Sequence, residues 1–144
     1  MQQRCVFCEI VAGRSPASVV AEGDLTLALL DILPVNEGHA LVIPRRHAAG
    51  LADLREDEAA ELMTLARRVA GAQRALGLAE GVSLVLADGA VAGQEVFHTH
   101  LHVVARRDGD KMVLAVDYDP PPSREALDAT AQALAGAMAT RAPG

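Results

Sequence analysis

The feature that most constrains this sequence is a run of alternating histidines in residues 97–104, Phe-His-Thr-His-Leu-His-Val-Val. His98, His100 and His102 stand two residues apart. A helix would turn successive members of this set to different sides, whereas an extended strand points all three imidazoles to one face. The residues between them then fill the opposite face. Burying three imidazoles would leave many ring nitrogens in need of partners, so a functional histidine strand is favoured over a structural one.

The composition and net charge limit which classes of molecule this protein can bind. The 144 residues suit one domain with one core. Aromatic residues make up only 2%, so platforms for stacking single-stranded nucleic acid are nearly absent. The net charge of -6 and the pI near 5.3 argue against nucleic acid or an anionic membrane as the main partner. A nucleotide stays compatible with this charge, because a pocket depends on its local donors.

The apolar runs are too short to cross a bilayer, and residues 5–12, interrupted by Glu9, lack the features of a signal peptide. With two cysteines and no export signal, we expect a cytoplasmic protein.

The periodicity predicts an α+β fold. The clearest helix spans residues 54–76, with apolar residues at three-four spacing, acids in its first turn and Gly77 at its end. A second helix, capped by Ser123, closes the chain. We expect antiparallel strands rather than a doubly wound parallel sheet, in a single domain with its core at about 5–106 and a C-terminal extension at about 107–144. The other expected elements are a short helix or turn at 4–12, strands at 18–21, 25–32, 39–43, 82–87 and 98–104, and an edge strand at 112–116.

Two blocks carry a family resemblance. Residues 98–104, preceded by Gly93-Gln94 and Val96, resemble the signature of the histidine-triad (HIT) nucleotide hydrolases and transferases. The resemblance covers about residues 5–106 and implies a HIT-like antiparallel sheet of about five strands, one long central helix, and a homodimer. The second block resembles the family in order and spacing, and consists of Asp31-Ile32, Pro34, Gly38-His39, residues 41–44 (Leu-Val-Ile-Pro) and His47.

The resemblance implies a covalent mechanism. His100 would attack the α-phosphorus of a nucleotide, and water would release the nucleoside monophosphate from the nucleotidyl-histidine. A histidine with its ordinary pKa of about 6.5 is mostly neutral, and so nucleophilic, at pH 7. His102 and His39 would contact the phosphate. The implied substrates are nucleoside phosphoramidates or dinucleoside polyphosphates.

By the same resemblance, Asp31 is the acid that binds ribose, since a carboxylate can accept hydrogen bonds from both sugar hydroxyls. A turn-capping role for Asp31 is the alternative. Core packing is an equal alternative to a base-pocket role for two of the apolar candidates, Phe7 and Ile10. Backbone N–H groups at Gly93-Gln94 would face the phosphate. The full set of further nucleotide-binding candidates is Ile32, Phe7, Ile10, Gly93, Gln94 and Glu95.

Cys5 and Cys8, spaced as Cys-x-x-Cys, form a candidate set of metal ligands together with His47 and His98. Some bacterial members of the family hold a structural zinc with such a set, and two thiolates with two imidazoles suit a closed tetrahedral Zn²⁺ site. Free thiols and a redox pair are the alternatives. The redox pair is the weaker one, because the residues before Cys5 are too few for the strand that precedes a thioredoxin-like motif.

Three positions depart from the family pattern. Ala87 stands where members carry an amide, Glu95 where a hydroxyl donates to phosphate, and Ala105 where proline is usual. Losing one preorganised donor can cost about 3 kcal/mol of transition-state stabilisation. One hypothesis is that Glu95 favours an amine leaving group. Two rivals to the hydrolase hypothesis stay open: a non-catalytic nucleotide-binding protein, and a metal-dependent hydrolase that uses the histidines as ligands.

Overall fold

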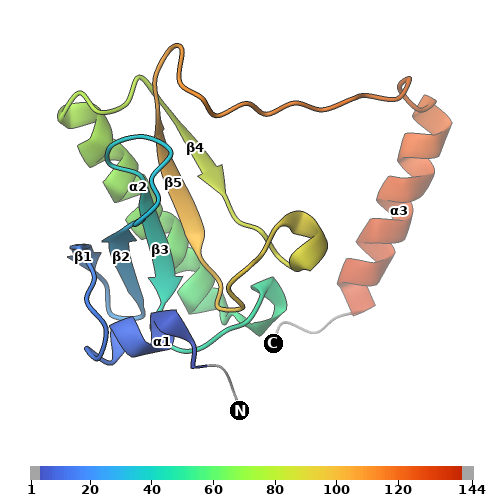
Figure 1. The fold of residues 1–144 in the computed structure, drawn as a ribbon. Helices are drawn as coiled ribbons and strands as arrows, with labels where there is room; N and C mark the ends of the chain where they lie inside the picture. Colours follow the sequence, from blue (N-terminus) through green and yellow to red (C-terminus); the bar gives the residue numbers. More distant parts are fainter. Residues whose placement is uncertain (1–3, 141–144) are drawn as a thin grey trace. The chain divides into compact units, whose positions relative to one another are not determined.

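The structure, a computed structural model, describes residues 4–140 (Figure 1). The chain divides into two compact units, one that ends at Lys111 and one that begins at Met112. The first unit contains α1 (Val6–Val11), β1 (Val19–Glu22), β2 (Thr26–Leu30), β3 (Ala40–Pro44), η1 (Leu51–Asp53), α2 (Glu56–Ala75), β4 (Gly81–Val85), η2 (Ala90–Ala92) and β5 (Leu101–Arg106). The second contains α3 (Arg124–Thr140).

The five strands form one antiparallel sheet in the order β1-β2-β3-β5-β4. This confirms the predicted α+β class. β5 pairs with β3 on one side and β4 on the other, so the last strand in the sequence lies inside the sheet. The pairing of Leu41 with His102 brings the histidine segment beside the chain that carries His39.

Both faces of the sheet are covered, which explains why β3 is buried along its whole length. Alternate residues of β2 and β3 pack against α2 on one face and against α1 on the other, as the strand period of two requires. The α2 side holds Ala28, Ala40, Val42, Leu62, Leu65, Ala66, Val69, Leu101 and Val103, and the α1 side holds Phe7, Leu27, Leu29, Leu41 and Ile43. Figure 1 shows α2 lying along one face of the sheet.

Helix α2 also braces the histidine segment. Its buried Gln73 donates from Nε2 to the carbonyl oxygens of Gly38 (2.8 Å) and Val103 (2.9 Å). One amide therefore fixes both the chain that leads to His39 and the centre of β5. The helix lies within the predicted range, and Gly77 follows it in the left-handed region at φ 70°, a conformation that costs glycine least.

Two strand predictions were wrong. No strand forms at 112–116, where strand-favouring residues have no ladder partner, and side-chain preference alone does not make a strand. The histidine strand begins only at Leu101, because the His98 side chain bonds to the last residue of β3, Pro44, and Thr99 bonds to Ala48 in the loop that follows. The predicted cap of the last helix is confirmed, since the Ala126 N–H donates to Ser123 Oγ at 3.1 Å. Within residues 4–140, no helix is both long and apolar enough to pass through a bilayer.

Candidate active site

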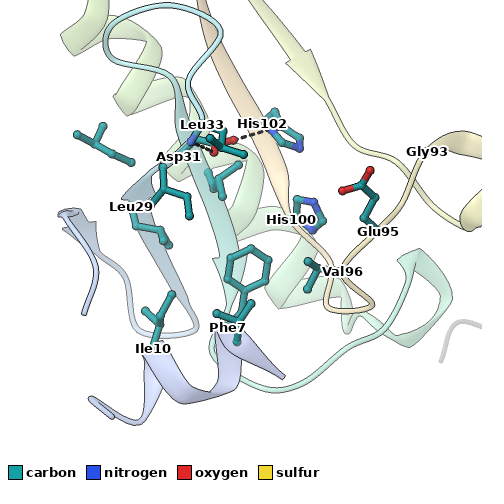
Figure 2. A pocket seen from close by; sticks show the side chains of 14 residues that line it. Phe7, Ile10, Leu29, Asp31, Leu33, Gly93, Glu95, Val96, His100 and His102 are labelled. Atoms are coloured by element: carbon teal, nitrogen blue, oxygen red, sulfur yellow. Dashed lines mark hydrogen bonds and ion pairs between the residues drawn. The ribbon is translucent and has the colours of Figure 1, made fainter. Parts of the chain in front are cut away.

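A hollow of about 450 Å³ opens where α1, the end of β2 and the entry to β5 meet (Figure 2). This volume lies within the range of about 300–1,000 Å³ that small-molecule sites occupy. Its lining consists of Val6, Phe7, Ile10, Leu29, Leu30, Asp31, Ile32, Leu33, Leu41, Gly93, Glu95, Val96, His100 and His102. The structure therefore brings two of the three alternating histidines to the same hollow as the predicted ribose and base residues.

The tautomer of His100 follows from one hydrogen bond. Its Nδ1 lies 2.8 Å from the backbone carbonyl oxygen of His98, which can only accept. The Nδ1 atom of His100 is therefore the protonated one in the neutral ring, and Nε2 keeps a bare lone pair. The ring packs against Phe7 and His102, with centroids 5.3 Å and 5.1 Å away, which holds its orientation.

A hydrogen-bonded series fixes the opposite tautomer at His102. The Val35 N–H donates to Nδ1 of His39 at 3.0 Å, so a neutral His39 carries its proton on Nε2. That Nε2 donates to Nδ1 of His102 at 2.9 Å, so His102 carries its proton on Nε2. Side by side, His100 thus offers a lone pair and His102 an N–H.

The rings of His39 and His102 are both held neutral. Burial lowers the pKa of His39, although the charge of Asp31 opposes the shift. Burial, with His100 and His39 nearby, lowers the pKa of His102 to about 4. At neutral pH the contacts from Asp31 Oδ2 to His39 Nε2 (3.5 Å) and His102 Nδ1 (3.7 Å) therefore join a carboxylate to neutral rings and are not ion pairs.

Asp31 lies at the end of β2, on the edge of the hollow. Its Oδ1 accepts the Leu33 N–H at 2.9 Å, so the turn-capping role that the sequence left open is present. Its Oδ2 faces the two histidines. Phe7 is likewise both a core residue and a lining residue, while Ile10 packs at the rim of the same core and also lines the hollow. For Asp31, Phe7 and Ile10, the structural role and the predicted binding role are therefore compatible.

Residues 93–95, in the loop before the histidines, were predicted to contact the nucleotide, and only part of this prediction agrees with the structure. Gln94 does not line the hollow, because its side chain braces the loop, donating to the carbonyl oxygens of Ala49 (2.7 Å) and Val96 (3.1 Å). The N–H groups of Gly93 and Gln94 donate to Ala90 and Gly89, so neither is directed to a phosphate. Gly93 and Glu95 do line the hollow.

Sequence reasoning missed several contributors to this site. Val35 acts through its backbone N–H, and no side-chain signal could reveal that contact. The missed lining residues are Val6, Leu29, Leu30, Leu33, Leu41 and Val96. Of these, strand alternation could have identified Leu29 and Leu41, which lie on the same face of the sheet as Leu27 and Ile43.

A second cluster lies beside the hollow. One nitrogen or sulfur atom from each of Cys5, Cys8, His47 and His98 falls within 4.8 Å of all the others. Cys5 Sγ lies 3.3 Å from His98 Nδ1, and Cys8 Sγ lies 3.4 Å from His47 Nδ1. The structure thus brings together all four predicted metal ligands, from α1 and from the loops around β3 and β5.

The chemistry of this donor set fits a zinc ion. Nε2 of the fully buried His98 donates to the Pro44 carbonyl oxygen at 2.8 Å, so its bare Nδ1 points at the thiols. A carbonyl that fixes the far nitrogen is the usual support of a metal-binding histidine. Burial and the nearby Cys5 raise the pKa of the Cys8 thiol to about 11, so forming its thiolate is unfavourable at neutral pH. A bound cation would stabilise the thiolate and lower this pKa.

Comparison with known proteins agrees with this fold. The HIT domain profile matches residues 12–109. The chain therefore belongs to the HIT domain family.

Three relatives show the range of similarity. An uncharacterized HIT-like protein of Mycobacterium tuberculosis is 44% identical over 111 residues, which is 77% of each chain. The adenosine 5'-monophosphoramidase of Schizosaccharomyces pombe is 39% identical over 102 residues, covering 71% of this chain and 74% of that protein. The adenylylsulfatase of Arabidopsis thaliana is 34% identical over 110 residues, covering 76% of this chain and 56% of that protein.

Two solved structures share the architecture. A HIT family protein from Bacillus anthracis has a TM-score of 0.88 at 32% identity, covering 95% of this chain and 99% of that one. A zinc-bound histidine triad family protein from Mycobacterium smegmatis has a TM-score of 0.72 at 40% identity, covering 92% of this chain and 96% of that one.

Proposed function

We propose that this protein is a nucleotide hydrolase or transferase that acts at the α-phosphate of nucleoside phosphoramidates or dinucleoside polyphosphates. The observation that carries the proposal is the bare Nε2 of His100, which follows from its Nδ1 hydrogen bond to the His98 carbonyl oxygen. An imidazole held in this tautomer, in the lining of a hollow of about 450 Å³, presents a lone pair that can attack phosphorus.

The proposed reaction has two steps. In the first, Nε2 of His100 bonds to the α-phosphorus, and the leaving group departs with the electrons of the broken P–N or P–O bond and takes up a proton from the solvent. In the second, water attacks the phosphorus and loses a proton to the solvent, the histidine–phosphorus bond breaks and returns its electrons to Nε2, and a nucleoside monophosphate leaves with the water oxygen. The N–H of His102 donates to a phosphate oxygen, where negative charge is concentrated in the transition state.

The remaining lining residues bind the nucleoside. Asp31 accepts from the ribose hydroxyls, while Phe7, Ile10 and Ile32 contact the base. His39 acts through His102, because its Nε2 faces that ring at 2.9 Å. Two relatives, an adenosine 5'-monophosphoramidase and an adenylylsulfatase, have names that point to adenylyl substrates, which supports an adenylyl compound as the first test.

We further propose that Cys5, Cys8, His47 and His98 hold a structural zinc ion, as the zinc-bound mycobacterial neighbour supports. When bound, the ion would crosslink α1 to the loops that follow β3 and precede β5. A closed set of four protein ligands leaves no position for a substrate, so the ion would stabilise the site and take no part in the reaction.

Two further assignments complete the proposal. The thiols of Cys5 and Cys8 are not joined in a disulfide, which suits a reducing compartment such as the cytoplasm. Family membership supports a homodimer in which the long helix pairs the two sheets.

Mass spectrometry tests the covalent step. The protein is mixed with adenosine 5'-phosphoramidate, quenched in acid-free denaturant within milliseconds, and digested. We expect an adenylyl group on the peptide that contains His100, and its absence in His100→Asn. Turnover with no adduct on that peptide, or an adduct that persists in His100→Asn, would refute the mechanism. Nucleotide binding without any turnover would favour the non-catalytic rival, and loss of turnover on strong chelation with the fold intact would favour the metal-dependent one.

A further inference from the structure

The charge of the candidate active site is unusual for a site that would bind phosphates. Among its described lining residues, the only formal charges are the carboxylates of Asp31 and Glu95, and neither lysine nor arginine is present. His102 is neutral, since its pKa lies near 4. A substrate therefore meets negative charge without a compensating cation.

Asp31 and Glu95 differ in what they can do for a substrate. The carboxylate of Asp31 is engaged by the Leu33 N–H and faces two histidines. Glu95 is exposed, and it makes no hydrogen bond or ion pair among the residues that the structure describes. Figure 2 shows its carboxylate turned toward the His100 ring. Its charge is thus unpaired and directed at the place where the reacting phosphorus would bind.

Glu95 also lies between two hollows. A second hollow adjoins the first through Val6, Glu95 and Val96, which line both. Its lining also holds Arg4, which does not line the first hollow, and three of the four proposed zinc ligands, Cys5, Cys8 and His47. A leaving group that reaches from the first hollow toward the second meets Glu95, which lines both.

From this arrangement we propose that Glu95 selects substrates by the charge of the leaving group, and that the preferred substrates are nucleoside phosphoramidates of cationic amines. This inference rests on the proposed function. A phosphoramidate carries one negative charge at its phosphorus, and a second cationic amine on the leaving group would pair with Glu95. A dinucleoside polyphosphate would bring several further negative charges toward the same carboxylate. The displaced group leaves as an amine, having taken up one proton as its P–N bond breaks.

Three adenosine 5'-phosphoramidates of matched size test the inference, with leaving groups ethylenediamine, n-propylamine and glycine, which carry charges of +1, 0 and -1. We expect kcat/KM to fall in that order, by about fivefold for each unit of charge, which is the Coulomb effect at about 6 Å with an effective dielectric constant of about 60, close to that of water, as suits an exposed carboxylate. Diadenosine tetraphosphate should be slower than all three. In Glu95→Gln the ratio between the first and last compounds should shrink toward one, and in Glu95→Lys it should invert.

Glu56→Gln is the matched control, because Glu56 is exposed in the first turn of α2 and lines neither hollow. It removes the same charge and should keep the wild-type order. A flat order in the wild-type protein, or an unchanged order in Glu95→Gln, would overturn the inference.

Binding separates this inference from the proposed function. Calorimetry with His100→Asn measures affinity for the same compounds without a covalent step. If the wild-type protein turns over none of them, the proposed function fails, and the charge order of the binding constants still decides whether Glu95 selects among ligands. Equal affinities with and without Glu95 would overturn the charge selection.

Discussion

The carbonyl oxygen of His98 accepts the Nδ1–H of His100 at 2.8 Å. One residue therefore serves two sites, since the buried ring of His98 belongs to the cysteine and histidine cluster while its backbone orients the proposed nucleophile. Anything that moves the His98 ring also moves the group that holds the His100 tautomer. The cluster and the hollow are in this sense one structural unit.

We expect purified protein to contain about one zinc ion per chain, and Cys8→Ser to contain almost none. Removing one of four ligands opens a closed tetrahedral site, and the binding free energy of structural zinc also stabilises the fold. Elemental analysis measures the metal content, and thermal unfolding measures the loss of stability. His102→Asn, outside the cluster, should keep its zinc. Full zinc content in Cys8→Ser would refute the ligand assignment.

The loop that carries His47 depends on a buried ion pair. Glu58, whose side chain is 3% exposed, accepts from Nε and Nη2 of Arg46 at 2.9 Å and 2.7 Å, and Arg46 also donates to the His47 carbonyl oxygen at 3.2 Å. The Arg46 guanidinium lowers the pKa of the Glu58 carboxyl group despite burial.

Glu58→Ala should therefore destabilise the protein by about 2–3 kcal/mol in urea unfolding. This is less than for a fully buried pair, because the Arg46 side chain is 38% exposed. The neighbouring Glu56→Ala, at an exposed position, should stay within about 0.5 kcal/mol of the wild type. Equal effects of the two substitutions would contradict the role of the pair.

The sequence predicted which candidate residues lie close together better than it predicted their hydrogen bonds and the limits of the strands. The alternating histidines, the Cys-x-x-Cys spacing and the position of Asp31 predicted side chains that the structure does bring together, because strand period and motif order are local properties. The start of β5 was wrong by three residues, since the bonds of His98 and Thr99 to Pro44 and Ala48 depend on loops distant in sequence. The bracing role of Gln94 was hidden for the same reason.

The pKa of His102 predicts a stability that depends on pH. The folded pKa is about 4 and the ordinary value is about 6.5, so between these values the unfolded chain binds a proton that the folded chain does not. Stability is fully present above pH 6.5 and is lost as the pH falls toward 4, by at most about 3 kcal/mol from this group.

His102→Asn removes that titration while keeping a possible acceptor for His39 Nε2. Its free energy of unfolding should fall less steeply than that of the wild type between pH 6.5 and 4.5. Chemical unfolding at a series of pH values measures the difference. Parallel profiles of the two proteins would show that His102 titrates alike in the folded and unfolded states.

The proposed reaction depends on the pattern of imidazole protons: His100 protonated on Nδ1, and His39 and His102 protonated on Nε2. Long-range ¹H–¹⁵N correlation spectra of the histidine rings at pH 7 test it most directly, with each ring assigned by substitution to asparagine. We expect a bare Nε2 at His100 beside an Nε2–H at His102. A proton on Nε2 of His100 would contradict it, because that nitrogen could not then attack a phosphorus.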